Sequence, residues 1–594
     1  MASLNLRLIA TSDLHATLWP YDYLANRPMP GRGLAVLAST ITQLRRENPN
    51  TLLLDNGDTL EGTPLADIAA SDADNVNPMI EAMNAAGYDA AVPGNHDFNY
   101  GLDTLCLAIE AADFPYVLSN IRCANGEPLL PASLVLEREL IDTSGSPHML
   151  RIGIVGLAPP QIVFWEKSHL RDSLVSEAVV PAATRELQRL QSDENVDVTI
   201  ALCHGGIDFN APEDGGENAV VPLAATGHVD AIIAGHTHDR FPRLDFSAQA
   251  LVDPTAGTVK GVPVVQPGAF GGEVGVIDLE LQPDSAGKWR PNVSASRLVQ
   301  GGQSVPDAAI LARTKTAHDR ALAQMTAHVG LTQRRLVGYF DLFAGCCVLS
   351  IVSSAQLLCA RQVLSEAGLG DAPLLSSVAP LRAGGSDGQS PYTDIPIGPL
   401  EQRHMFDIYP YANRLVVKKI TGAGLRAWLE QASHSFLPIV PGLPGQKLLD
   451  LRVAGYAFDV IEGVTYEIDV TAPKNMPRIR NLCYQDVPVT DDAAFYIVTN
   501  SYRAGGGSGY LAARDAETVL NTDLFIRDVV ADYIRDAGEV VPAPLSNWRF
   551  AAAGGTPVIA ETGMGAAASL KQATNLGLRY IGVAGGVAQF EVKI

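Results

Sequence analysis

The sequence predicts an α/β protein of two domains, or three, and three observations support this prediction. With 594 residues, of which 47% are hydrophobic and 18% charged, the chain can bury large cores. In the first half, short apolar runs alternate with segments of helical periodicity, which is typical of parallel sheets covered by helices. A further helical pattern begins after Pro306, where the composition changes. We therefore expect domains over 1–305 and 336–594, joined by a linker helix region over 306–335.

Charge and hydropathy exclude some classes of partner. The formal net charge is −22, from 43 basic and 65 acidic residues. This charge repels polyanions, so we expect no binding of nucleic acid polymers, and an anionic substrate would need local positive charge from bound metal or a few arginines. No stretch approaches the roughly 20 uninterrupted apolar residues of a membrane span, so we expect no membrane association.

The N-terminus and the cysteines bear on the compartment. Residues 1–14 lack the basic start, long apolar run and small-residue cleavage site of an export signal. The seven cysteines are few for this length, and the adjacent Cys346 and Cys347 are typical of buried thiols. Both features favour a reducing, cytoplasmic location if the chain is native as written.

The first predicted strand, residues 6–11, runs directly into Asp13 and His15. Because side chains alternate along a strand, we expect these two to point to the same side as half of a metal site. Taken alone, a capping Asp and a surface His would be the simpler interpretation.

The second buried strand, residues 51–54, follows a helical segment over 34–46 and ends in a polar turn. In that turn Asp58 follows a glycine that permits a tight backbone, and an Asp there can bridge two cations. Asp55 is the rival, but it lies nearer the body of the strand, where it would brace the loop.

The central motif is PGNHDFNYG, residues 93–101, at the end of a third apolar run. Asn95 offers an oxygen ligand and His96 an imidazole that handles protons. Two more apolar runs end the same way: 196–202 leads into His204, and 231–234 leads into His236 and His238. Without these partners, a merely polar turn at Asn95 would deserve equal weight.

Five strand ends therefore carry ligand-type side chains that outnumber the four ligands of one zinc ion. Paired metals about 3.5–4 Å apart are the usual device for phosphoester hydrolysis, because they activate water and neutralise charge on phosphoryl oxygens. Donors without Cys allow Mn, Co, Fe or Zn and do not choose among them. The predicted ligands are Asp13, His15, Asp58, Asn95, His204, His236 and His238.

The second half contains no such cluster and is predicted to be a partner domain. We expect a strand over 414–420, a helix over 425–432, and a hairpin whose two-residue turn is Glu462-Gly463. A strand over 495–499 leads into a glycine-rich loop that resembles neither a dinucleotide-binding fingerprint nor a Walker loop.

These motifs together resemble a known family over nearly the whole chain. DLH at 13–15, GD at 57–58, GNHDFNYG at 94–101, CHGG at 203–206 and GHTH at 235–238 resemble the signature of the metal-dependent 5′-nucleotidase family of calcineurin-like phosphoesterases. FNYG after His96, FDVIEGVTYEIDVT from 458 and NSYRAGGG from 500 are more similar to the bifunctional 2′,3′-cyclic-nucleotide 2′-phosphodiesterase/3′-nucleotidases. In 5′-nucleotidases an Asp that pairs with the catalytic His usually stands where this chain has Asn99, and this departure favours the cyclic-nucleotide branch.

The resemblance implies a fold and a set of roles. The fold would be an N-terminal four-layer α/β metallophosphoesterase domain followed by a C-terminal α/β nucleotidase substrate-binding domain. His96 would be the catalytic histidine, and Asp58 would bridge two divalent metal ions. One ion would be held by Asp13, His15 and His238, and the other by Asn95, His204 and His236.

In the second half, the resemblance implies a nucleoside site with the base between two aromatic rings. Tyr411 and Tyr502 match the stacking positions, and Asn413 a polar contact, although the residues alone would favour ordinary core tyrosines. Arg382 resembles a substrate-binding arginine. Ser508 stands where 5′-nucleotidases tend to have an Asp. The substrate would then lie between the domains, and rotation about the linker helix would control its binding and release.

The expected activity is hydrolysis of 2′,3′-cyclic nucleotides to 3′-nucleotides, and of these to nucleosides and phosphate. The alternatives are a 5′-nucleotidase or nucleotide-sugar hydrolase, a sulfur-ester hydrolase of the same superfamily, and a non-catalytic nucleotide-binding protein. We expect a monomer that acts on small nucleotides, in the periplasm if a signal peptide was removed.

Overall fold

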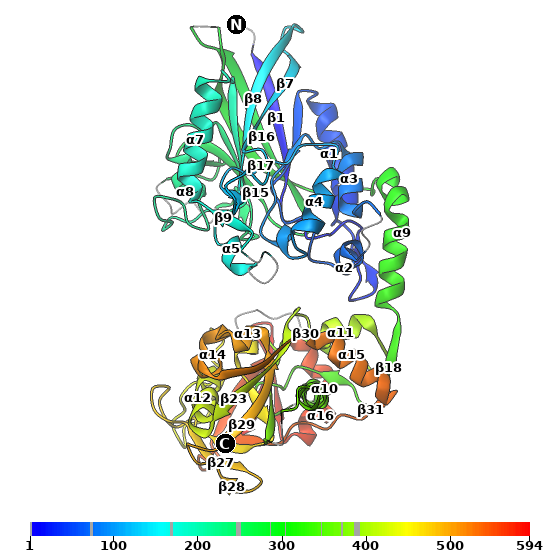
Figure 1. The fold of residues 1–594 in the computed structure, drawn as a ribbon, viewed down its shortest axis with the longest axis vertical. Helices are drawn as coiled ribbons and strands as arrows, with labels where there is room; N and C mark the ends of the chain where they lie inside the picture. Colours follow the sequence, from blue (N-terminus) through cyan, green and yellow to red (C-terminus); the bar gives the residue numbers. More distant parts are fainter. Residues whose placement is uncertain are drawn as a thin grey trace. The chain divides into compact units, whose positions relative to one another are not determined.

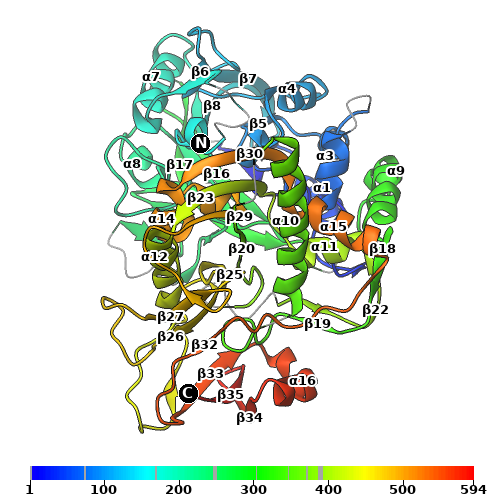
Figure 2. The same ribbon diagram turned by 60° about the horizontal axis from the view of Figure 1, so that its bottom comes forward.

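The computed structural model describes residues 3–71, 75–166, 170, 172–244, 251–285, 287–302, 304–345, 347–369, 372–384 and 392–594. The chain forms two compact units, Met1–Gln324 and Met325–Ile594. Figures 1 and 2 draw both units as ribbons.

Two sheets form the centre of the first unit. The first sheet consists, in spatial order, of β17 (Trp289–Gln300), β16 (Glu273–Pro283), β1 (Leu4–Thr11), β4 (Thr51–Asp55) and β5 (Ala90–Ala91). The second sheet follows the order β13 (Val252–Asp253), β14 (Thr258–Val259), β15 (Val262–Pro267), β11 (Ala231–Ala234), β10 (Val198–Cys203), β8 (Pro147–Leu157) and β7 (Ser133–Ile141). The strands β1, β4 and β5 run parallel, as do β8, β10, β11 and β15, so their carboxyl ends share an edge in each sheet.

Helices cover the outer faces of these sheets (Figure 1). On one side lie α1 (Leu34–Glu47) and α3 (Pro78–Ala86), and on the other α7 (Val179–Ser192) and α8 (Val220–Ala224). The apolar stripe of α1 is buried, α1 packs on β16, and α7 packs on β8 and β10. Because β15 packs against β16 and β17, the sheets face each other between the helices. The predicted four-layer α/β arrangement is confirmed.

The helix that follows Pro306, α9 (Ala308–Met325), is held within the first unit by aromatic contacts. The Trp19 ring stacks on His318 at 3.8 Å between centroids, and the Tyr23 hydroxyl lies 2.8 Å from its Nδ1. Other elements of this unit are β2 (Tyr21–Asp22), β3 (Arg27–Pro28), α2 (Pro64–Ala70), α4 (Leu102–Glu110), β6 (Ile121–Cys123), α5 (Ile162–Trp165), β9 (Leu174–Ser176) and β12 (Arg240–Phe241).

The second unit is built on a mixed sheet (Figure 2). Its order is β25 (Val460–Glu462), β20 (Leu374–Val378), β29 (Ala494–Asn500), β23 (Arg414–Thr421) and β30 (Glu517–Phe525). The helix α10 (Cys347–Glu366) packs on β20 and on α15 (Ile526–Ala537). Among the described residues α10 alone is long and apolar enough to cross a membrane, but 56% of that stretch is buried, as in the core helix of a folded domain.

Smaller sheets and helices complete this unit. The sheets are β22 (Gly398–Glu401), β18 (His328–Thr332) and β31 (Glu539–Val540); β24 (Gln446–Lys447), β33 (Pro557–Thr562), β35 (Val587–Lys593) and β34 (Arg579–Ala584); β28 (Val487–Pro488), β27 (Ile479–Tyr484), β26 (Thr465–Ile468) and β32 (Trp548–Phe550); and β19 (Leu336–Val337) with β21 (Asp394–Ile395). The helices are α11 (Gln402–Ile408), α12 (Gly422–Ala432), α13 (Ser501–Ala504), α14 (Leu511–Asp515) and α16 (Leu570–Asn575).

The hairpin predicted around Glu462-Gly463 is wrong. β25 pairs with β20, whereas β26 pairs with β27 and β32, so this turn carries the chain from one sheet to another. A two-residue hairpin turn of the commonest type needs positive φ at both central residues. Only Gly463 meets this requirement, with φ of +103°, because Glu462 continues the strand β25.

The described cysteines form no disulfide. Cys347 is buried, as expected, and Cys346 lies outside the described residues.

Candidate metal centre

The strand ends of the two sheets in the first unit are tied together by backbone hydrogen bonds. The N–H groups of Asp13 and His15 donate to the carbonyl oxygens of Gly57 and Asp58, each at 2.8 Å. Across the two sheets, Nδ1 of His204 lies 2.6 Å from the carbonyl oxygen of Asn56. The loops after β1, β4 and β10 therefore share one site.

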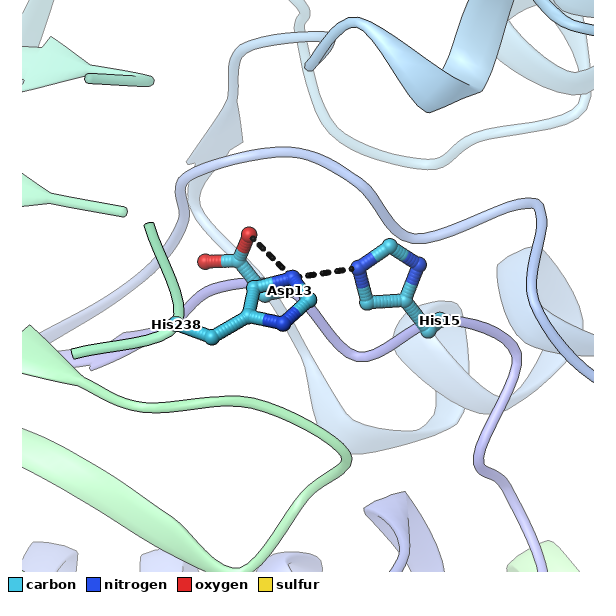
Figure 3. Close-up of side chains that lie close together, drawn as sticks. All are labelled: Asp13, His15 and His238. Carbon is cyan, nitrogen blue, oxygen red and sulfur yellow. Dashed lines mark hydrogen bonds and ion pairs between the residues drawn. The ribbon is translucent and has the colours of Figure 1, made fainter. Parts of the chain in front are cut away.

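Three of the predicted ligands form a first ligand cluster: Asp13, His15 and His238 (Figure 3). Nε2 of His15 lies 2.9 Å from Nε2 of His238, which lies 3.6 Å from Oδ1 of Asp13. Nδ1 of His15 lies 3.1 Å from the carbonyl oxygen of Glu61, so Nε2 is the nitrogen left for a metal ion. Three ligand atoms that converge in this way can hold one divalent cation.

A second ligand cluster contains Asp58, His204 and His236. The predicted ligand Asn95 belongs with them, since its Oδ1 lies 2.8 Å from Nδ1 of His236 and 3.2 Å from Nε2 of His204. The other ring nitrogen of His236, Nε2, lies 2.6 Å from the carboxylate of Glu217. A carboxylate in this place fixes the imidazole tautomer, which leaves Nδ1 to face the cluster.

Asp58 lies between the two clusters. Its Oδ1 accepts the backbone N–H of His96 at 2.7 Å. Its Oδ2 is buried, accepts no hydrogen bond of regular geometry, and lies 3.1 Å from Nε2 of His204 and 3.9 Å from Nε2 of His15. A buried acceptor directed at both clusters fits a carboxylate shared by two cations, so the residues present suit a pair of divalent metal ions.

Burial and neighbouring charges shift the protonation equilibria of the site. Burial raises the pKa of the Asp13 carboxyl to about 6. Burial, followed by the neighbouring His15, lowers the pKa of His238 to about 4, which keeps it in the neutral form that binds metal. Burial would lower the pKa of His204, but Asp58 and then Asp13 raise it to about 10. A buried carboxylate balanced by a histidine proton is a place where a cation can replace that proton.

The backbone of the site lies in the left-handed region at several non-glycine residues, which costs of order 1–3 kcal/mol each. Such strain persists only where surrounding structure enforces it, and it gathers at functional sites. Among the predicted ligands the φ values are +53° for Asp13, +47° for His15, +55° for Asp58, +70° for His236 and +58° for His238.

The reason predicted for the closeness of Asp13 and His15 is wrong. Alternation of side chains along a strand does not apply to them, because β1 ends at Thr11. The left-handed φ values of the loop bring them together instead.

Glycine is required where the loops meet. A Cβ on Gly94 would lie 2.2 Å from Oδ1 of Asp58, so only glycine permits this approach of the two loops.

Two buried carboxylates brace the site without joining it. Asp97, which was not predicted as a site residue, accepts the backbone N–H groups of Asp58, Thr59, Leu60 and Gly94 at 2.8–2.9 Å. Its position directly after His96 was the feature of the sequence that could have indicated this role. Asp55 accepts the hydroxyls of Thr11 and Thr59 and the N–H of Gly57. Asp55 therefore braces the loop after β4, as the sequence predicts.

His96 stands beside the clusters and is in neither. Its ring lies 5.3 Å from that of His15, and its side chain is 41% exposed. Nδ1 of His96 lies 3.3 Å from the amide nitrogen of Asn99 and 3.5 Å from the carboxylate of Glu61. Neither Glu61 nor Glu217 was predicted: Glu217 lies in a loop without a recognisable motif, and Glu61 lies beyond the motif that contains Asp58.

The predicted nucleoside residues meet in the second unit. Tyr411, Asn413 and Tyr502 line a cavity of about 190 Å³ together with Tyr456, which the sequence analysis missed. Tyr456 contacts Tyr411 and Tyr502 edge-on, at 6.1 and 6.4 Å between ring centroids. Tyr411 and Tyr502 are 43% and 47% exposed, so they are not the core tyrosines that residue type alone would favour. We call this cavity the tyrosine pocket.

Arg382 is placed differently from these residues. Its guanidinium pairs with Asp407 at 2.7 Å, and its side chain is only 17% exposed. It is not among the residues that line the tyrosine pocket, although its neighbour Leu381 is. Ser508 lies near the pocket, with its hydroxyl 3.3 Å from that of Tyr502.

Comparison with known proteins places both units in described families. The calcineurin-like phosphoesterase model matches residues 6–240, and the model of the 5′-nucleotidase C-terminal domain matches 351–515. The chain is 34% identical to the 2′,3′-cyclic-nucleotide 2′-phosphodiesterase/3′-nucleotidase of Haemophilus influenzae, over 92% of this chain and 88% of that protein. It is 35% identical to a trifunctional nucleotide phosphoesterase protein of Bacillus subtilis, over 94% of this chain but only 40% of that protein.

Solved structures of related proteins are similar to this chain. The calcineurin-like phosphoesterase structure from Bacillus subtilis matches with a TM-score of 0.52 and 37% identity, over 54% of this chain and 98% of that one. A putative 5′-nucleotidase from Staphylococcus aureus has the same fold over 92% of this chain and 99% of its own, with a TM-score of 0.67 at 21% identity. The two matched models and the similarity to full-length relatives establish that the chain belongs to the calcineurin-like phosphoesterases with a 5′-nucleotidase C-terminal domain, in the branch that includes the bifunctional 2′,3′-cyclic-nucleotide 2′-phosphodiesterase/3′-nucleotidases.

Proposed function

We propose that this protein is a two-metal hydrolase that converts 2′,3′-cyclic nucleotides to 3′-nucleotides and then hydrolyses these to nucleosides and phosphate. The observation that carries the proposal is the pair of ligand clusters that Oδ2 of Asp58 faces. The substrate class is supported by relatives of 31–34% identity that bear this name in three organisms.

We assign one divalent ion to the first ligand cluster and the other to Asn95, His204 and His236, with Asp58 bridging. Two such ions supply Lewis acidity and activate water for attack on phosphorus. Oxygen and nitrogen donors without sulfur are compatible with Mn, Zn, Co or Fe, so the identity of the metal stays open.

The residue that acts on the leaving group is His96. In the first reaction water adds to phosphorus and the bond to the ribose 2′ oxygen breaks, and in the second the bond to the 3′ oxygen breaks. Each departing oxygen needs a proton, and a protonated imidazole beside the clusters can donate it. Since Nδ1 faces Asn99 and Glu61, Nε2 is the nitrogen free for this transfer.

Base recognition is assigned to the second unit. Tyr411 and Tyr502 offer faces for stacking, which is sequence-tolerant because every base has a π face, and Asn413 offers a polar contact. Substrate binding by Arg382 stays a prediction, and it would require the guanidinium to share its pairing with Asp407. A monomeric state and a periplasmic or cytoplasmic location likewise stay predictions.

The test is a comparison of substrates with the metal-loaded protein. We expect turnover of 2′,3′-cyclic AMP and 3′-AMP to exceed that of 5′-AMP and UDP-glucose. Preference for either of the last two would instead indicate a 5′-nucleotidase or a nucleotide-sugar hydrolase. Turnover of none of the four, with two metals bound per chain, would leave a nucleotide-binding module.

A further inference from the structure

We propose that Glu61 is a positioning residue for His96, holding its Nδ1–H so that Nε2 is presented to the substrate. The inference rests on the proposed function, because it assigns a role within that reaction. It begins from one distance, 3.5 Å between Oε2 of Glu61 and Nδ1 of His96. Hydrogen bonds of catalytic groups are often this long in free enzymes and tighten when the substrate binds.

The carboxylate of Glu61 faces two histidines and lies nearer to Nδ1 of His96, although it also, against the effect of burial, raises the pKa of His15. Oε2 of Glu61 lies 3.8 Å from Nδ1 of His15, but that nitrogen lies closer, at 3.1 Å, to the backbone carbonyl oxygen of Glu61. One residue can therefore orient two histidines, one through its carbonyl group and the other through its side chain.

Asn99 alone does not account for the orientation of His96. Its amide nitrogen lies 3.3 Å from Nδ1, and its Oδ1 is buried without a hydrogen-bond partner. Either orientation of a neutral amide gives one uncharged contact. A carboxylate gives a charge-assisted hydrogen bond, which is about twice as strong. It accepts only, so it keeps a proton on Nδ1 both before and after Nε2 gives its proton to the leaving group.

The loop that carries Glu61 packs closely against the loop that carries His15. It follows Asp58, whose backbone N–H donates to Asp97 at 2.9 Å. The next residue, Gly62, has φ of +134°, and a Cβ there would lie 2.6 Å from Cβ of His15. This close packing fixes the position of Glu61 relative to the ligand loops, so its carboxylate is delivered by the same turn that delivers Asp58.

The experiment moves the carboxylate from one side of Nδ1 to the other. Glu61→Gln keeps the size of the side chain and removes its charge. Asn99→Asp in the same chain restores a carboxylate at a residue that already contacts Nδ1. Glu166→Gln is the matched control, because Glu166 interacts electrostatically with His96 and Glu61 but forms no ion pair with His96 among the described residues.

For each variant, kcat and KM are measured with 3′-AMP and with bis-p-nitrophenyl phosphate, and bound metal by elemental analysis. We expect Glu61→Gln to lower kcat for 3′-AMP by about 10- to 100-fold, the usual scale for an outer partner of a functional histidine, with KM and both metals kept. The loss should be smaller for the p-nitrophenyl substrate, whose leaving group is acidic. Glu61→Gln/Asn99→Asp should recover most of the loss, and Glu166→Gln should change little.

Three results would overturn the inference: an unchanged kcat in Glu61→Gln, loss of a metal ion from that variant, or no recovery in the double variant. The second result would mean that Glu61 acts through His15. Failure of the proposed function is distinguishable, since the parent protein itself would then hydrolyse neither substrate.

Discussion

The metal centre of the first unit and the tyrosine pocket of the second are built on opposite principles. The metal centre is charged, most of its predicted ligands are buried, and five of these ligands have left-handed backbone. In the tyrosine pocket Tyr411 and Tyr502 are nearly half exposed, and neither they nor Tyr456 have positive φ. The metal centre holds its ligand atoms by means of a strained backbone. The tyrosine pocket presents aromatic faces on an unstrained backbone.

The difference matches the roles proposed for the two sites. Charge that develops at phosphorus is stabilised only by groups held in place beforehand, so small displacements matter there. A base is bound by stacking, which tolerates changes of base and of position. Substitutions in the metal centre should therefore act on turnover, and those in the tyrosine pocket on substrate affinity.

The largest effect is expected from Asp58→Ala. Because Oδ2 of Asp58 faces both clusters, its loss should empty or scramble both metal sites and lower turnover by more than about 10³-fold. His15→Ala is the matched control and should weaken mainly one site. Elemental analysis measures both, and full occupancy in Asp58→Ala would refute the bridge.

The second largest loss of turnover is expected from His96→Ala. It is in neither cluster, so the variant should fold and keep both metals while turnover of 3′-AMP falls by about 10²- to 10⁴-fold, the scale of a general acid. The loss should shrink for bis-p-nitrophenyl phosphate. An equal loss for both substrates would mean that His96 serves the phosphoryl oxygens instead of the leaving group.

Tyr411→Ala or Tyr502→Ala should leave the chemistry intact. Loss of one stacking face costs roughly 1–3 kcal/mol, so KM for nucleotides should rise by about 5- to 150-fold. Hydrolysis of p-nitrophenyl phosphate, which carries no base, should be unchanged. A comparable loss with this small substrate would contradict the separation of roles between the two units.

The smallest effect concerns a histidine outside both sites. In contrast to His204, burial lowers the pKa of His404 to about 4, and its Nδ1 accepts the backbone N–H of Glu401 at 2.9 Å. The unfolded chain takes up this proton below pH 6.5 and the folded chain only near pH 4, so stability is complete above 6.5 and falls between 6.5 and 4.

His404→Gln removes this titration, and glutamine at this helix position can keep a capping contact. Its stability should therefore fall less than that of the parent over the same pH window. Unfolding midpoints measured between pH 7 and 4.5 test this, and parallel curves would contradict it.

The sequence by itself determined the chemistry of the metal centre. Apolar runs ending in Asp58, Asn95, His204 and His236 could be read as parallel strands, and the carboxyl ends of such strands share an edge wherever they lie in the sheet. The type of ligand and its place at the end of a strand therefore follow from local pattern, whereas the division of these strands between two sheets does not. The tyrosines at 411 and 502 came from resemblance alone, because stacking faces leave no periodic signal.

Only the tertiary structure decided which groups support those residues. Glu61, Glu217 and Tyr456 reach their partners across loops, and nothing in their local sequence states which atom they will face. The left-handed φ of Asp13 and His15 and the passage of the Glu462-Gly463 turn between two sheets are likewise set by the surrounding packing. Local sequence encodes periodicity and residue chemistry, whereas contacts between distant loops and tolerated backbone strain depend on the energy of the whole fold.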